Sequence, residues 1–314
     1  MTSPFAQAVE LLADRVDPKI EMSIDTEQEM IWRQTISDGL AAGAMTPDVV
    51  EAYAGLLLRT EAGVPIRPAP HHRLWLQLLC DDRIPELLIL APPEAAKTTW
   101  IVSAWLGCRT GFYPEQPNII CSATGPIAKR RTLSLRNQTQ LISWQSVFRN
   151  VRKVDSMLWR HEEWSVAPEG VPFSGRIHPT AAAFGVDGSI TGARGRVIAC
   201  DDIVTRVNAK THYQRTQVKE FVHSTLFQRL MSSGEPGIPS GISRKVLIGT
   251  PYHPDDIYAE LIDSGRYVVC STPLLGTEDY VDGVPYYATV TYPDDWPYET
   301  LGEAVIRPED GEAA

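Results

Sequence analysis

Apolar residues follow two different spacings along the chain, one typical of helices and one typical of strands. Up to about residue 70, helical spacing recurs in three segments, FAQAVELLADRV, EMIWRQTISDGLAAG and PDVVEAYAGLLLRT, and predicts a helical lead-in. A linker with three prolines, GVPIRPAPHHR, comes next, and LWLQLLCDD predicts one more helix. His71 and His72 stand at this boundary, where a surface or capping role is favoured over a role as ligands.

From residue 86 onward, short apolar runs bounded by turn residues alternate with helical segments. Strands are predicted at residues 87–91, 118–122, 197–200, 245–249 and 267–271. Helices are predicted from Lys97 to Gly107 and over residues 127–148, 208–230 and 255–264. This alternation predicts an α/β fold, with a mostly parallel central sheet and helices on both faces.

Two regions of the chain depart from that alternation and suggest how the chain is organised. Residues 150–190 have the turns and short alternations of hairpins. Residues 276–314 are acidic and rich in Pro and Tyr, and predict little order beyond a short helix near Tyr298. We therefore expect a helical lead-in at 1–70, a main domain at 71–275 and a tail or linker at 276–314.

Composition excludes several classes of protein. The chain has 314 residues, of which 43% are hydrophobic and 22% charged, as in a globular protein with a substantial core. There is no apolar run of about 18 residues, so no membrane span is expected, and the N-terminal residues lack the pattern of a signal peptide. The five cysteines lack metal-type spacing and are expected to be reduced in a cytosolic protein.

Charge is distributed unevenly within a net charge of −10. Residues 129–160 contain eight basic residues and one acid, whereas residues 276–314 contain ten acids and one arginine. A basic segment inside an acidic chain indicates either a polyanion-binding surface or a solvated helix face.

The first chemical motif is ELLILAPPEAAKTTW at residues 86–100. It predicts a strand, a tight loop and a helix opened by Lys97 and Thr98, which is the layout of a phosphate cradle: backbone N–H groups face the anion, the lysine reaches the outer phosphates and the threonine hydroxyl holds Mg²⁺. Alanines occupy both glycine positions of G-x-x-x-x-G-K-[ST], at Ala91 and Ala96, and a positive φ at either would cost roughly 1 to 2 kcal/mol. The alternative is a plain strand-to-helix turn with a surface lysine.

The second motif, RVIACDDIV, is a buried strand ending in two carboxylates. Asp201 is expected to hold Mg²⁺ through water, and Asp202 to orient and deprotonate an attacking water. Adjacent side chains on a strand point to opposite faces, but a turn of the backbone at its end would let both reach one site. A strand followed by a capping turn is the alternative.

The third motif, RKVLIGTPYHPDD, places Thr250 at the end of another strand. Thr250 is expected to sense the outer phosphate and to couple its loss to the helix that begins at Asp255 and Asp256. Alternatively, Thr250 only ends a strand.

In this order and at these separations, APPEAAKTT, TGARGRVIACDD and VLIGTPYHPDDIYAELI resemble the ATPase domain of the large terminase subunit of tailed bacteriophages, over about residues 70–275. The resembling positions are Pro92, Pro93, Lys97, Thr98, Thr191, Gly192, Asp201, Asp202, Thr250, Tyr252, His253, Asp255 and Asp256.

The resemblance implies a P-loop NTPase of the additional-strand class, with Walker A and Walker B motifs, that hydrolyses ATP with Mg²⁺ and translocates viral double-stranded DNA. It assigns nucleotide contacts to Pro92, Pro93, Glu94, Ala95, Ala96, Lys97, Thr98 and Thr99. It assigns Mg²⁺ to Thr98 and Asp201, catalysis to Lys97 and Asp202, and coupling to Thr250. It also implies an arginine supplied to a neighbouring subunit, for which Arg136 is the first choice and Arg131 the second.

The same resemblance implies which partners the chain has and where it acts. The implied partners of the chain are a portal protein, a small terminase subunit and other copies of the chain in a homo-oligomeric ring, with no membrane. The implied location is the host cytoplasm and, transiently, the portal vertex of the procapsid. The family usually continues into a nuclease domain, which this chain is not expected to contain, so a separate nuclease subunit or a shortened chain is implied.

Two departures keep rival functions open. Glu94 stands where the family often has a basic residue, and Ala96 where it has glycine. One rival is a weakened, non-hydrolysing module that serves portal and terminase assembly, and another is a helicase-like ATPase unconnected to packaging.

Overall fold

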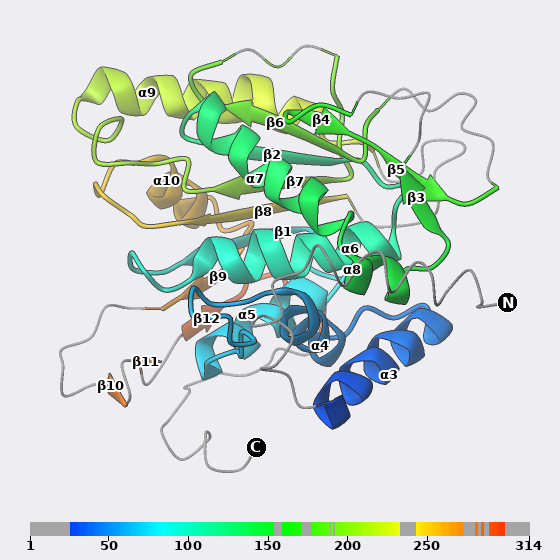
Figure 1. Cartoon of the computed structure of the whole chain (residues 1–314). Coiled ribbons are helices and arrows are strands. Elements are labelled where there is room, and N and C mark those ends of the chain that lie inside the picture. The colour runs from blue at the N-terminus through cyan, green and yellow to red at the C-terminus, as the bar shows by residue number, and fades with distance from the viewer. Residues whose placement is uncertain are drawn as a thin grey trace, which may run out of the picture.

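A mixed eight-stranded sheet forms the centre of the protein in the computed structural model (Figure 1). The structure describes residues 26–153, 159–170, 178–188, 190, 192–232, 243–272, 280–281, 284–285 and 289–298. The predicted helix FAQAVELLADRV, Thr191 and most of the acidic tail lie outside these described residues.

The strands follow the order β12-β9-β1-β8-β7-β2-β6-β4 across the sheet. The parallel strands are β1 (Glu86–Leu90), β2 (Asn118–Ser122), β6 (Ala181–Gly185), β7 (Val197–Asp201), β8 (Arg244–Gly249) and β9 (Val268–Ser271). The antiparallel edge strands are β4 (Glu163–Trp164) and β12 (Thr289–Thr291). The predicted α/β class with a mostly parallel sheet is therefore confirmed.

The segments expected to depart from the alternation do so, but they contain more sheet structure than predicted. The hairpin pattern at 150–190 is confirmed by β3 (Val151–Lys153), which pairs with β5 (Val166–Pro168), and by β4, which pairs with β6. The same segment also supplies β6 as a parallel neighbour of β2. The expected lack of order in the tail is wrong at β12, which pairs with β9 and extends the main sheet. A further small pair joins β10 (Tyr280–Val281) and β11 (Val284–Pro285).

Helices cover both faces of the sheet, because successive apolar residues of each buried strand point to opposite sides. In β1, Leu87 and Ile89 belong to one core cluster, and Leu88 and Leu90 to the other. The first face carries η1 (Thr99–Leu106), α6 (Gly107–Phe112) and α7 (Gly125–Gln138), with α4 (Pro47–Leu57) and α5 (Pro70–Cys80) packed against η1. The second face carries α9 (His212–Glu220), η2 (Phe221–Leu226), η3 (Phe227–Arg229) and α10 (Ile257–Asp263).

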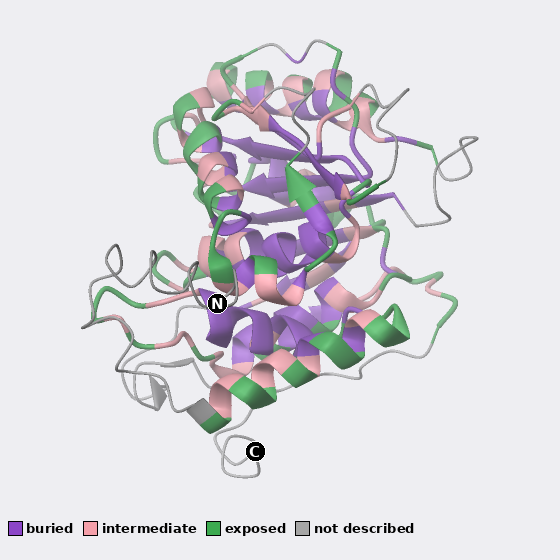
Figure 2. Cartoon of the chain, turned by 45° about the vertical axis from the view of Figure 1, so that its right-hand side comes forward, coloured by how far each residue is buried: buried purple, intermediate pink, exposed green. Residues whose placement is uncertain are grey.

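The lead-in is helical where it is described. Helix α3 (Thr26–Ala42) packs against α4, and α8 (Ile142–Val147) contacts both. In Figure 2 the strands of the central sheet are purple, whereas α3 is mostly green and pink because much of its surface faces solvent. No helix among the described residues combines the length and the apolar character needed to cross a membrane.

Several predicted helix boundaries are wrong for identifiable reasons. Gly107 does not end its helix, because α6 continues to Phe112. Glycine is needed there for packing: an added Cβ would lie 2.5 Å from the Gln138 side chain and 2.7 Å from the Tyr53 hydroxyl.

The other two long predicted helices also differ from the prediction. The helix expected at 127–148 breaks between α7 and α8. The helix expected at 208–230 begins only at His212, because Thr211 accepts a hydrogen bond from the backbone N–H of Gln214 and caps it. Asn208 instead belongs to the preceding loop, where its side-chain amide donates to the Ile203 carbonyl.

Arg244, the first residue of β8, joins the amino end of that strand to α5. Its guanidinium is fully buried and donates to the carbonyls of Ile84 (2.8 Å), Leu79 (2.5 Å) and Leu78 (3.1 Å). Leu78 and Leu79 lie in the last turn of α5, so two of these contacts satisfy carbonyls that have no partner within the helix. Burial lowers the pKa of Arg244 to about 10, so the side chain stays charged at neutral pH.

Candidate functional site

The loop between β1 and the following helix adopts an unusual backbone conformation. Ala91 still pairs with the sheet, since its N–H donates to the Gly249 carbonyl at 3.1 Å, and the two prolines that follow have no N–H with which to continue the ladder. Glu94 and Ala96 both have positive φ, of 69° and 51°. Of the two alanines at glycine positions, only Ala96 is therefore left-handed, and the expected strain applies there alone.

This conformation suits an anion. Left-handed residues alternating with ordinary ones turn successive backbone N–H groups towards one concavity, the arrangement known as a nest. The helix begins at Lys97, and the N–H groups of its first turn have no partner within the helix. Glu94 and Ala96 are exposed, so solvent reaches the loop. The residues predicted to contact nucleotide, from Pro92 to Thr99, make up this loop and first turn.

Lys97 is buried beneath the loop. Its ammonium donates to the Pro92 carbonyl (2.7 Å), the Ala91 carbonyl (3.3 Å) and the Thr250 hydroxyl (3.0 Å), and lies 3.9 Å from the Asp202 carboxylate. The side chain is 5% exposed, and this burial lowers the pKa of Lys97, while the two aspartates counteract that effect. The surface lysine of the alternative interpretation is thus not what the structure shows.

Asp201, the last residue of β7, is fully buried and accepts two donors. The Thr98 hydroxyl lies 2.9 and 3.0 Å from its two carboxylate oxygens. The Nε of Arg131, on α7, donates to Oδ2 at 2.8 Å. The first and second motifs, about a hundred residues apart, therefore meet directly.

Asp202 reaches the same site because the backbone turns. Its φ is +49°, and its N–H donates to the Ile248 carbonyl at 2.9 Å. Burial raises the pKa of Asp202, and neighbouring Lys97 partly opposes that rise. The expectation that both carboxylates reach one place at the end of the strand is met.

Thr250 completes the cluster from the neighbouring strand end. Its hydroxyl accepts from Lys97 and donates to the Ala91 carbonyl at 2.9 Å. Gly249, just before it, packs so closely on Tyr258 that an added Cβ would lie 2.0 Å from the tyrosine hydroxyl. The three strand ends that carry the motifs thus converge, with β8 between β1 and β7.

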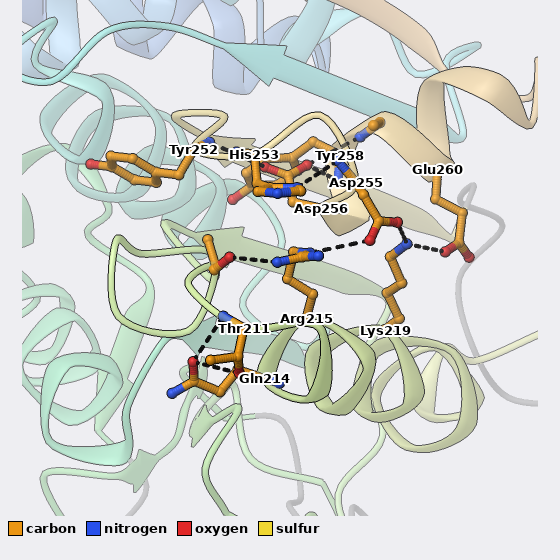
Figure 3. A network of polar contacts seen from close by, with 12 residues as sticks. Thr211, Gln214, Arg215, Lys219, Tyr252, His253, Asp255, Asp256, Tyr258 and Glu260 are labelled. Carbon is orange, nitrogen blue, oxygen red and sulfur yellow. Dashed lines mark hydrogen bonds and ion pairs between the residues drawn. The ribbon is translucent and has the colours of Figure 1, made fainter.

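Beyond Thr250 the chain is anchored to α10 and α9 (Figure 3). Asp256 caps α10 by accepting from the backbone N–H groups of Tyr258 (2.9 Å) and Ala259 (3.2 Å). Asp255 pairs with Arg215 (3.2 Å) and Lys219 (2.8 Å) of α9. The segments that follow Asp202 and Thr250 are therefore joined by ion pairs.

His72, on α5, contacts the loop between β1 and η1. The sequence did not indicate this contact. The Nδ1 of His72 accepts from the Ala69 N–H at 3.0 Å, so Nε2 carries the proton and donates to the Ala95 carbonyl at 3.1 Å. The ring stacks on Trp100 at 5.1 Å between centroids. Burial lowers the pKa of His72 to about 3 and that of His71 to about 4. The predicted capping role is confirmed for His72, but a surface position is wrong for both residues.

The candidate arginines lie in different places. Arg131 contacts Asp201 of its own chain, whereas Arg136 lies against the Trp159 ring, 5.7 Å from its centroid, and donates to the Trp159 carbonyl at 3.3 Å. Lys153 also faces Trp159. The basic residues of 129–160 therefore do not share one helix face, and a role of Arg136 in a neighbouring subunit stays a prediction.

The donor set at Asp201 fits Mg²⁺ bound together with phosphates. Among the described residues there is no group of three or more His, Cys, Asp or Glu able to hold a metal unaided. Mg²⁺ in nucleotide sites usually has one or two carboxylates, with waters and phosphate oxygens as its other ligands. The Thr98 hydroxyl and the Asp201 carboxylate offer such a partial set beside the loop.

Comparisons with known proteins give a weak structural similarity. No protein-family profile and no curated protein sequence matches the chain. A solved structure, the large terminase of bacteriophage HK97, is similar with a TM-score of 0.44 and 12% sequence identity. The similarity covers 75% of this chain and 46% of that one, so the chain spans less than half the length of that terminase. The similarity is limited to the fold.

Proposed function

We propose that the chain is an ATPase that uses Mg²⁺ and a P-loop of the additional-strand class. The observation that carries the proposal is the convergence of Lys97, Thr98, Asp201, Asp202 and Thr250 beside a loop with left-handed residues at its turn. Lysine, a hydroxyl and paired carboxylates at the ends of parallel strands are the groups that phosphoryl transfer requires. The position of β8 between β1 and β7 agrees with the additional-strand class.

Each residue has a separate task in this proposal. The loop N–H groups and the Lys97 ammonium bind the β- and γ-phosphates and offset their charge. Thr98 and Asp201 hold Mg²⁺, which neutralises charge on the phosphate oxygens when it is bound. Asp202 orients the attacking water and accepts its proton, and its raised pKa makes it a stronger base.

Thr250 is the proposed coupling residue. It contacts both Lys97 and the Ala91 carbonyl, so a change at the outer phosphate alters its hydrogen bonds. The same segment continues to Asp255 and Asp256, which are bound to α9 and α10. Loss of the outer phosphate would thereby be transmitted to both helices.

The wider function follows from the resemblance of the three motifs to large terminase subunits. We propose that ATP hydrolysis drives translocation of viral double-stranded DNA through a portal into a procapsid in the host cytoplasm. Other copies of the chain in a ring, a portal protein and a small terminase subunit would be its partners.

Substitution of Lys97 tests the site. In Lys97→Ala we expect ATP turnover to fall at least about 100-fold, because the phosphates lose their charged partner, while circular dichroism stays that of the wild type. Lys210→Ala, which changes an exposed lysine, is the matched control and should keep its activity. Phosphate release would be measured with and without double-stranded DNA. Equal turnover in Lys97→Ala and wild type would remove the site assignment, and a wild type inactive in all conditions would favour the assembly-module alternative.

A further inference from the structure

We propose that Arg131 and a divalent cation are alternative occupants of Asp201, so that the guanidinium holds the carboxylate only until the metal displaces it. This inference rests on the proposed Mg²⁺ site. It assigns Arg131 a positioning role within its own chain, in place of a contact to a neighbouring subunit.

Burial decides which of the two partners moves. The Asp201 side chain is 0% exposed, whereas that of Arg131 is 35% exposed. A carboxylate enclosed in the protein requires a positive partner, since an uncompensated buried charge is strongly unfavourable. Asp201 is fixed at the end of β7 between β2 and β8, whereas a long arginine side chain on the surface of α7 has room to leave.

The contact between Arg131 and Asp201 is a single hydrogen bond. Arginine and carboxylate groups frequently pair through two parallel N–H donors, which strengthens the contact. Arg131 offers one hydrogen bond, from Nε to Oδ2, and it makes no other side-chain hydrogen bond to the described residues. The exchange therefore breaks a single hydrogen bond.

Charge repulsion prevents the Arg131 guanidinium and a divalent cation from binding Asp201 at the same time. Lys97 and Arg131 balance Asp201 and Asp202 in the arrangement observed. A divalent cation held by Asp201 and Thr98 would lie against the guanidinium, and like charges at contact distance repel strongly where solvent is excluded. The released arginine stays on α7 at the same edge of the sheet, where nucleotide phosphates would attract it.

The test measures metal binding rather than turnover. Mn²⁺ is titrated by electron paramagnetic resonance into wild type, Arg131→Gln and the matched control Arg130→Gln, which changes the exposed neighbour, each with and without ADP. Removing the competing guanidinium should tighten Mn²⁺ binding about tenfold in Arg131→Gln, the equivalent of roughly 1.4 kcal/mol. Arg130→Gln should match the wild type, and Asp201→Asn should lose the site.

Each result has a defined meaning. Weaker binding in Arg131→Gln would show a permanent brace, and unchanged binding would show that the ion pair does not compete; either overturns the exchange. If wild type binds Mn²⁺ and ADP but Arg131→Gln is no tighter, the exchange fails while the proposed ATPase site stands. If wild type binds neither, the proposed function itself fails.

A second measurement uses the intact protein, in case Arg131→Gln does not fold. The Nε–H resonance of Arg131 is assigned by its loss in the Arg131→Lys spectrum and followed while Mg²⁺ and ADP are added to wild type. Displacement should shift this resonance and speed its exchange with water. A resonance that stays in place while Mg²⁺ binds would refute the proposal.

Discussion

The left-handed alanine in the β1–η1 loop yields a stability prediction with an internal control. Ala96 has φ +51°, a conformation that costs an L-residue roughly 1 to 2 kcal/mol and glycine almost nothing. Glycine also gives the unfolded chain more freedom, which costs about 0.4 to 1 kcal/mol. Ala96→Gly should therefore stabilise the folded state by about 0.5 to 1 kcal/mol, and the exposed position leaves no packing to lose.

The assay is equilibrium urea denaturation of wild type, Ala96→Gly and Ala95→Gly. Ala95 lies in the same loop but does not have a positive φ, so Ala95→Gly should lose about 0.4 to 1 kcal/mol through the unfolded state. The melting temperature of Ala96→Gly should rise by about 1 °C in a chain of this size. If Ala96→Gly is no more stable than Ala95→Gly, the strain at this turn is absent and the reasoning is refuted.

Two further predictions concern the supports of the site. The unfolded chain binds protons at His71 and His72 near pH 6.5, whereas the folded chain binds them only near pH 4 and pH 3. The free energy of unfolding should therefore be highest above about pH 7. It should fall by about 2 kcal/mol per histidine by pH 5. His72→Gln should halve this loss in urea titrations at several pH values, and an unchanged pH slope would contradict the buried neutral ring. Gly249→Ala should destabilise by roughly 1 to 3 kcal/mol, because its Cβ would meet Tyr258. Gly188→Ala, with only an ordinary contact at 3.4 Å, should be nearly neutral in the same assay, and equal losses in both variants would exclude the clash.

The parallel strands and the site they carry were accessible from the sequence because both depend on local patterns. Short apolar runs, each followed by Lys97, Asp201 or Thr250, place these residues at one edge of any parallel sheet. The structure brings them within hydrogen-bond or ion-pair distance. Their roles with nucleotide and metal stay predictions until binding is measured.

What the sequence did not predict depends on packing between distant segments. Gly107 gives the signal of a helix end, but its neighbours Tyr53 and Gln138 come from other helices. The hydrogen bond of His72 to the Ala95 carbonyl and that of Arg131 to Asp201 likewise join residues that no local periodicity relates. Such contacts become visible only when the tertiary arrangement is known.

Arg244 fixes the amino ends of β1 and β8 to α5. Because one guanidinium donates to carbonyls in the last turn of α5 and in the turn before β1, it joins both segments to the start of β8. At the carboxyl ends of the strands, the buried Lys97 ammonium joins the loop after β1 to Thr250. Farther along the chain, Asp255 is joined to α9 by ion pairs of a half-exposed carboxylate, which ionic strength weakens. Added salt should therefore weaken the connection of α9 to the segment after Thr250 and leave the buried contacts of Arg244 intact.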